Sequence, residues 1–149
     1  MAAVECKKTV ENIMMPAQAI WMIRLSLVYL IIAVLFGGII FIQKVINIHP
    51  AIWSLLPIHY EVAIWGWLVQ FLMGTAYWMF PKYILGTRRG SESLAWAMVI
   101  LFNCGLILLV ISTFAINIAI VARGLIFISI CQFVILVWQR VVTYRNVNS

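Results

Sequence analysis

Four long apolar segments separated by short polar ones make up most of this 149-residue chain. A helix needs about 20 apolar residues to cross the hydrocarbon core of a bilayer. The stretch 93–139 contains one charged residue, Arg123, and is too long for a single span. We therefore divide it into two helices, with a turn near 117–124. The predicted spans, in chain order, lie at about 22–44, 58–80, 93–115 and 121–142.

The segments between the spans differ in character. Residues 45–57 contain Pro50 and Pro57 and are predicted to form a short connection, which could run along the membrane surface. The second span ends at Pro81, because proline cannot continue a helix. Residues 82–92 form a polar loop that contains Arg88 and Arg89. The pattern therefore predicts an all-α integral membrane protein, a bundle of four transmembrane helices.

Composition supports a membrane protein. Hydrophobic residues make up 66% of the chain and charged residues 9%, whereas soluble domains have roughly 45–50% apolar and about 25% charged residues. This composition excludes a water-soluble domain, a disordered chain and a nucleic-acid-binding module. Cys6, Cys104 and Cys131 form no CxxC pair and fit no zinc spacing, so we expect no disulfide.

The distribution of basic residues predicts the orientation. With four spans, eight Lys and Arg residues fall on the side of the termini, and only Lys44 and Arg123 fall on the other. Cytoplasmic segments carry the excess of Lys and Arg, so both termini are predicted to be cytoplasmic. Residues 1–19 then form a cytoplasmic N-terminal segment, 20–143 the transmembrane domain and 144–149 a cytoplasmic tail. His49 and His59 are placed on the outer side.

The start of the second span contains the strongest candidate for chemistry. At helical spacing, His59 shares one face with residues that are small or polar: Ala63, Gly66, Gln70 and Gly74. A histidine above such a face would allow a flat macrocycle to approach the helix, and imidazole is a common axial ligand of haem iron. The alternative is helix packing, because small residues are also enriched where transmembrane helices meet.

Other polar residues have two interpretations each. His49 is either the second haem ligand or a solvated loop residue. Arg123, with Lys44, either pairs with haem propionates or lipid phosphate, or anchors the helix ends at the membrane surface. Glu61, an acid inside a predicted span, is either a proton carrier or a hydrated interfacial residue. Gln70 is expected to bond a neighbour, and the candidates are Asn103 and Gln132.

The second span resembles the second transmembrane helix of haem–copper oxidase subunit I. His59 is followed by WGW at 65–67, by Gln70 and by GTAYWMFP at 74–81. The closest branch is that of the nitric-oxide reductases and C-type oxidases. This resemblance implies that His59 is a metal ligand, at the position of the low-spin haem ligand. The family has many more spans, and its other haem and copper ligands follow later, where this chain has no histidine.

The resemblance therefore implies no binuclear centre and no independent catalysis by this chain. We expect a haem-b-binding electron-transfer or supporting subunit of a respiratory membrane complex. The alternative is a cofactor-free structural or assembly subunit, and a small transporter is the third hypothesis. The expected surroundings are the lipid bilayer of a prokaryotic inner membrane, with further copies or a larger complex as partners and no nucleic acid.

Overall fold

The computed structural model describes residues 15–80, 91–112 and 116–148, and every element in these ranges is helical. Four of the helical segments are long and apolar enough to cross a membrane. The all-α, four-span prediction is confirmed at this level, and the four segments indicate a multi-pass membrane protein. The elements are α2 (Ala17–Ile46), η1 (Pro50–Ser54), α3 (Leu55–Glu61), η2 (Val62–Val69), α4 (Gln70–Met79), α5 (Glu92–Ile111) and α6 (Ile116–Asn148).

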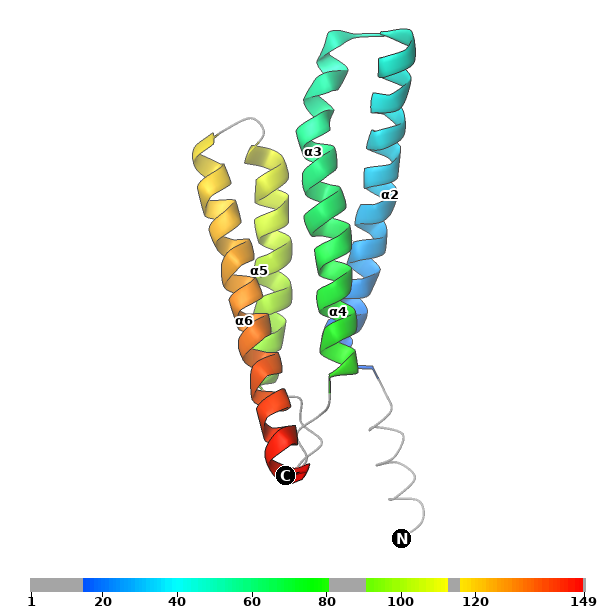
Figure 1. Ribbon diagram of the computed structural model, residues 1–149. Helices are drawn as coiled ribbons and strands as arrows, with labels where there is room; N and C mark the ends of the chain where they lie inside the picture. The colour runs from blue at the N-terminus through cyan, green and yellow to red at the C-terminus, as the bar shows by residue number, and fades with distance from the viewer. Residues whose placement is uncertain (1–14, 81–90, 113–115, 149) are drawn as a thin grey trace.

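The helices form two antiparallel hairpins that stand side by side (Figure 1). The first hairpin pairs α2 with a continuous helix made of η1, α3, η2 and α4. The second pairs α5 with α6. The helices pack more closely within each hairpin than between the hairpins. The first hairpin reaches further than the second at the end opposite the C-terminus (Figure 1).

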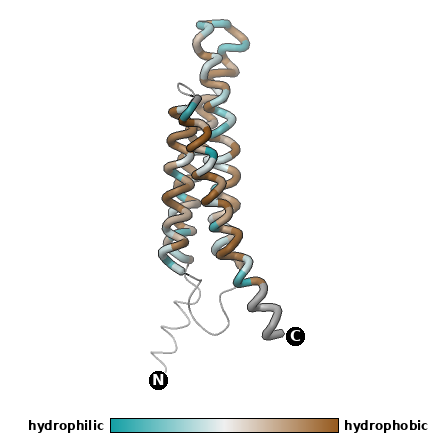
Figure 2. The backbone as a smooth tube through the Cα atoms, turned by 90° about the vertical axis from the view of Figure 1, so that its left-hand side faces the viewer, coloured by the Kyte–Doolittle hydropathy of each residue, from teal (hydrophilic) through white to brown (hydrophobic). Residues whose placement is uncertain are grey.

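Hydrophobic residues predominate along the long helices of the bundle (Figure 2). Large hydrophobic side chains point outward on all four spans, and several are more than half exposed, among them Val34, Phe41, Leu72, Ile107 and Ile120. Monomeric soluble proteins rarely expose apolar patches larger than a few hundred Å². Lipid is therefore the solvent that matches this surface.

The interior of the bundle takes residues from every span. Met22, Met73, Phe102 and Ile126 belong to one buried cluster, and Ala33, Ile58 and Val62 form a second cluster between α2 and the α3–η2 helix. The two helices of the second hairpin approach closely at Gly105. A Cβ atom there would lie 3.0 Å from the carbonyl oxygen of Ala122. Small residues at such a contact allow transmembrane helices to pack backbone to backbone.

An eight-residue π-helix, η2, interrupts the second span. π-helices bond residue i to i+5, are usually limited to one turn and are frequent at functional sites. Because each turn of a π-helix contains more residues than a turn of an α-helix, residues four positions apart stay on the same side of the span. Accordingly, one side of the span is buried at 58, 62, 66, 70 and 74, and the other is exposed at 60, 64, 68 and 72.

Two predicted boundaries are wrong. The turn was expected near 117–124, but α6 already begins at Ile116, so these residues are helical. Arg123 therefore lies on α6 and not in a turn. Polar residues and Gly124 resembled a turn, but glycine is tolerated in transmembrane helices. The connection expected at 45–57 is also shorter, since η1 already begins at Pro50. Proline fits a first helical turn, where its missing N–H would have no partner.

The end of the chain continues the last helix. Residues 144–149, predicted as a cytoplasmic tail, are helical as far as Asn148. Residues 1–14 of the predicted N-terminal segment and most of the loop predicted at 82–92 lie outside the described residues.

Candidate functional site

His59 is held against α2 by a hydrogen bond to the backbone. Its Nδ1 lies 2.9 Å from the carbonyl oxygen of Ala33. A carbonyl oxygen can only accept, so Nδ1 carries the proton and donates it. In the neutral imidazole, Nε2 then carries no proton and has a lone pair. Histidines that bind a metal commonly donate their other ring N–H to such a carbonyl, which fixes the tautomer and the ring orientation.

The ring of His59 also lies directly on Gly37. A Cβ atom at Gly37 would be 2.9 Å from Cε1 of the ring, whereas a Cβ atom at Gly38 would have no atom within 4 Å. The first glycine of the pair is therefore required for the position of the imidazole. The second is open to its surroundings.

The rest of the predicted face of the second span is covered by neighbouring helices. A Cβ atom at Gly66 would be 2.9 Å from the ring of Tyr29 and 3.0 Å from Leu106. At Gly74 it would be 3.0 Å from Met22. Ala63 is half-buried and packs against the cluster of Ala33 and Ile58. This packing fits the helix-contact interpretation of the face, because neighbouring side chains cover Gly66 and Gly74.

His49 contacts the start of η1. Its Nδ1 accepts a hydrogen bond of 3.2 Å from the N–H of Ala51, which caps the first turn. Its own N–H donates to Oε1 of Gln43 at 2.9 Å. These bonds hold the connection between α2 and η1. They do not bring His49 to His59.

A buried polar cluster joins three spans near the middle of the bundle. Oδ1 of Asn103 accepts hydrogen bonds from the hydroxyl of Tyr29 and from Nε2 of Gln70, both at 3.3 Å. Asn103 also donates to the carbonyl of Val99 at 2.8 Å. The expected bond between Gln70 and Asn103 is confirmed. Gln70 is completely buried, so its side chain joins helices and does not line an open face.

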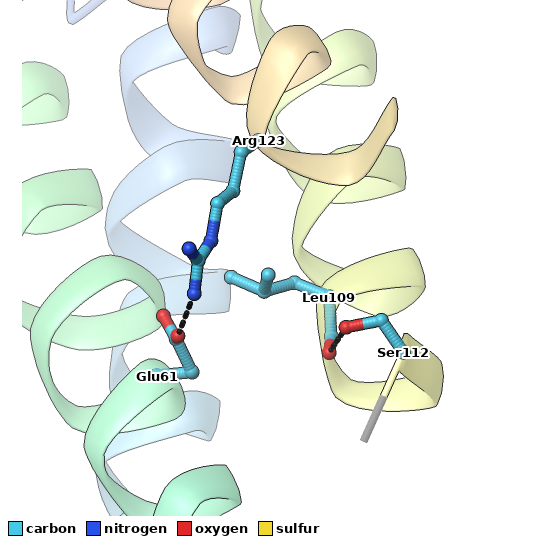
Figure 3. Close-up of polar contacts among 4 residues, drawn as sticks. All are labelled: Glu61, Leu109, Ser112 and Arg123. Carbon is cyan, nitrogen blue, oxygen red and sulfur yellow. Dashed lines mark hydrogen bonds and ion pairs between the residues drawn. The ribbon is translucent and has the colours of Figure 1, made fainter. Parts of the chain in front are cut away.

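Glu61 and Arg123 form an ion pair between the hairpins (Figure 3). Nη2 of Arg123 lies 3.3 Å from Oε1 of Glu61, and the two side chains are 70% and 25% exposed, respectively. The available signal for the pair in the sequence is that Glu61 and Arg123 are opposite charges inside two apolar spans, the second and the fourth, where a charged residue needs a partner.

The same ion pair borders a pocket of about 490 Å³. The pocket lies between the two hairpins and has aromatic and aliphatic walls in addition to the two charges. Its lining residues are Glu61, Trp65, Leu109, Arg123, Ile126, Phe127 and Ile130.

Arg140 is a second charged residue with a structural role that the sequence did not reveal. It is completely buried, its guanidinium stands 4.2 Å from the centre of the Tyr77 ring, and Nη1 donates to the carbonyl of Tyr77 at 3.1 Å. A cation is favourable at the C-terminal end of a helix, and Tyr77 is in the last turn of α4. In the sequence, Arg140 is one of the eight basic residues that predict the orientation.

The described residues contain no group of three or more His, Cys, Asp or Glu side chains that could bind a metal ion. Comparisons with protein-family models, with curated proteins and with solved structures found no match to this chain.

Proposed function

We propose that this chain is a multi-pass subunit of a respiratory electron-transfer complex in a prokaryotic inner membrane, and that His59 supplies one axial ligand to haem b. The observation that supports the proposal is the hydrogen bond from Nδ1 of His59 to the carbonyl of Ala33. It presents Nε2 as the nitrogen with the lone pair, as a metal-binding histidine requires. The resemblance of the second span to oxidase subunit I adds to this support.

The chain's own residues hold and orient the imidazole. Ala33 fixes its tautomer, and Gly37 leaves the space that the ring occupies. Haem, when bound, carries one electron at a time, with a potential set by its ligands and surroundings. Because His49 is engaged at the start of η1, a second protein ligand would come from another copy or from a partner subunit. Such a subunit has no independent catalysis.

The proposed orientation places both termini in the cytoplasm. The basic residues on the terminal side support it, because cytoplasmic segments are enriched in Lys and Arg. Lys44 and the Glu61–Arg123 pair would then lie toward the outer side, together with His59. Arg123 is a candidate partner for the haem propionates, but it forms an ion pair with Glu61.

A second candidate is a cofactor-free structural or assembly subunit. The packing at Gly66 and Gly74 favours it, since neighbouring side chains already occupy the face on which a macrocycle was expected. This candidate predicts that His59 serves only to join α3 to α2.

An absorption spectrum separates the two candidates. The chain is produced with an ample supply of haem and purified in detergent as wild type, His59→Ala and His49→Ala, and reduced-minus-oxidised difference spectra are recorded. We expect a sharp haem b band in the wild type and in His49→Ala, and its loss in His59→Ala.

Two results would contradict the haem proposal. One is a colourless wild-type protein that is folded by helical circular dichroism, both alone and in membranes that contain its native partners. The other is a haem band that survives in His59→Ala. The first result favours the structural subunit. Loss of the band in His49→Ala as well would instead show that both ligands come from this chain.

A further inference from the structure

The pocket between the hairpins has the size of a small-molecule site. Its volume is about 490 Å³, and ligand sites measure roughly 300–1,000 Å³. Such sites are mostly apolar with a few polar groups that orient the ligand. This pocket has that composition, with Glu61 and Arg123 as its charged residues. Neither His59 nor the face of Gly66 and Gly74 belongs to its lining.

Most of the apolar lining lies deeper in the bundle than the ion pair, while Leu109, near the end of α5, lies beside the pair (Figure 3). Both α3 and α6 run away from the end at which α5 finishes and α6 begins. Trp65 follows Glu61 by about one turn, and Ile126 and Ile130 follow Arg123 in the same direction. The deeper part of the pocket is therefore apolar, and the ion pair lies toward the end of the bundle at which α5 finishes. This polarity matches a molecule with a polar head and an apolar body that enters from the lipid phase.

The ion pair limits the charge of that head. The guanidinium of Arg123 and the carboxylate of Glu61 lie 3.3 Å apart. An anionic head would be attracted by Arg123 but repelled by Glu61, and a cationic head would be attracted by Glu61 but repelled by Arg123. A neutral head that donates a hydrogen bond to the carboxylate and accepts one from the guanidinium satisfies both residues. Hydrogen bonds to charged groups are the strong ones.

We infer that this pocket binds a neutral, membrane-soluble molecule whose headgroup both donates and accepts hydrogen bonds, with alkyl-substituted hydroquinones as the representative class. Glu61 accepts from a hydroxyl of the head, and Arg123 donates to an oxygen of the same head. Trp65 and Phe127 contribute the aromatic part of the walls. The site is separate from His59 and does not depend on haem.

The test measures binding of tritiated decylhydroquinone to the full-length chain in nanodiscs, by scintillation proximity under anaerobic conditions. We expect saturable binding to the wild type and a loss of roughly tenfold or more in affinity for Glu61→Gln, because a charge-assisted hydrogen bond is removed. Ile130→Trp, which fills the half-buried wall of the pocket, should abolish binding. The dimethyl ether of the probe, which cannot donate, should compete poorly.

Matched variants control for folding and charge. Ile128→Trp makes the same exchange on the lipid-facing side of α6, where Ile128 is 49% exposed, and Glu92→Gln removes an exposed acid outside the pocket. Both should bind like the wild type. Non-saturable uptake that is equal in all variants would overturn the inference, because it would show partition into lipid only. Competition by phosphatidylglycerol, with tighter binding in Glu61→Gln, would also overturn it, by showing a site for acidic lipid heads.

Discussion

Nδ1 of His59 lies 2.9 Å from the carbonyl oxygen of Ala33, a residue on the preceding span. The bond joins the start of the α3–η2 helix to the middle of α2 and sets the tautomer of the ring. It also places the ring on Gly37. His59 is the only histidine inside the described spans. Its position depends on the backbone carbonyl of Ala33 and on the absence of a Cβ atom at Gly37.

Gly37→Ala should displace His59. The added Cβ would lie 2.9 Å from Cε1 of the ring, so the imidazole must move away from Ala33. We expect a loss of about 1–3 kcal/mol of stability, the usual cost of overpacking, measured by SDS unfolding in micelles. Any haem band should weaken or shift. Gly38→Ala is the matched control, because a Cβ there meets no atom within 4 Å, and equal losses in both variants would refute the packing described here.

Gly105→Ala should separate the helices of the second hairpin. Its Cβ would lie 2.9 Å from Ile126 and 3.0 Å from the carbonyl oxygen of Ala122. A backbone atom cannot avoid this contact by a change of rotamer, as a flexible side chain can. We expect destabilisation of about 1–3 kcal/mol, measured by the same unfolding titration. Gly124→Ala, at an open position on α6, should leave stability unchanged, and a wild-type midpoint for Gly105→Ala would contradict the close approach.

Asn103 should be coupled energetically to both of its donors. Tyr29→Phe and Gln70→Ala each remove one hydrogen bond to Oδ1 of Asn103. Hydrogen bonds between transmembrane helices contribute about 0.6 kcal/mol on average, so each single change should cost little. Asn103→Leu should cost more, because it leaves both donors without an acceptor. Double-mutant cycles that combine Asn103→Leu with Tyr29→Phe and with Gln70→Ala test this, and zero coupling for both pairs would exclude the cluster.

The proposed orientation predicts which ends react from outside the cell. Single cysteines are introduced at Ile48 and at Ser149 in a chain whose three natural cysteines have been replaced by serine or alanine. A membrane-impermeant maleimide added to intact cells should label the cysteine at position 48 and spare the one at position 149 until the membrane is opened. The reverse labelling would invert the orientation, and labelling of both would contradict four spans.

The number and type of the elements could be predicted from the sequence. The length of each apolar run, set against the thickness of a bilayer, defined four helices, and the structure confirms four candidate spans. The sequence also predicted that Gln70 would bond a neighbour, with Asn103 as one of two candidates, because a polar residue in an apolar span needs a partner. These are local properties, readable from composition and spacing along one segment.

Which residues of different spans contact one another depends on the tertiary structure. Helical spacing assigned Gly66 and Gly74 to a face but could not show that Tyr29 and Met22 cover it. The π-helix at 62–69 also changed the register of that face, and no residue pattern marked it. Glu61 and Arg123 are 62 positions apart, and their pairing depends on how the two hairpins are set side by side. Contacts between spans follow from packing in three dimensions, on which the hydropathy of a single segment carries no information.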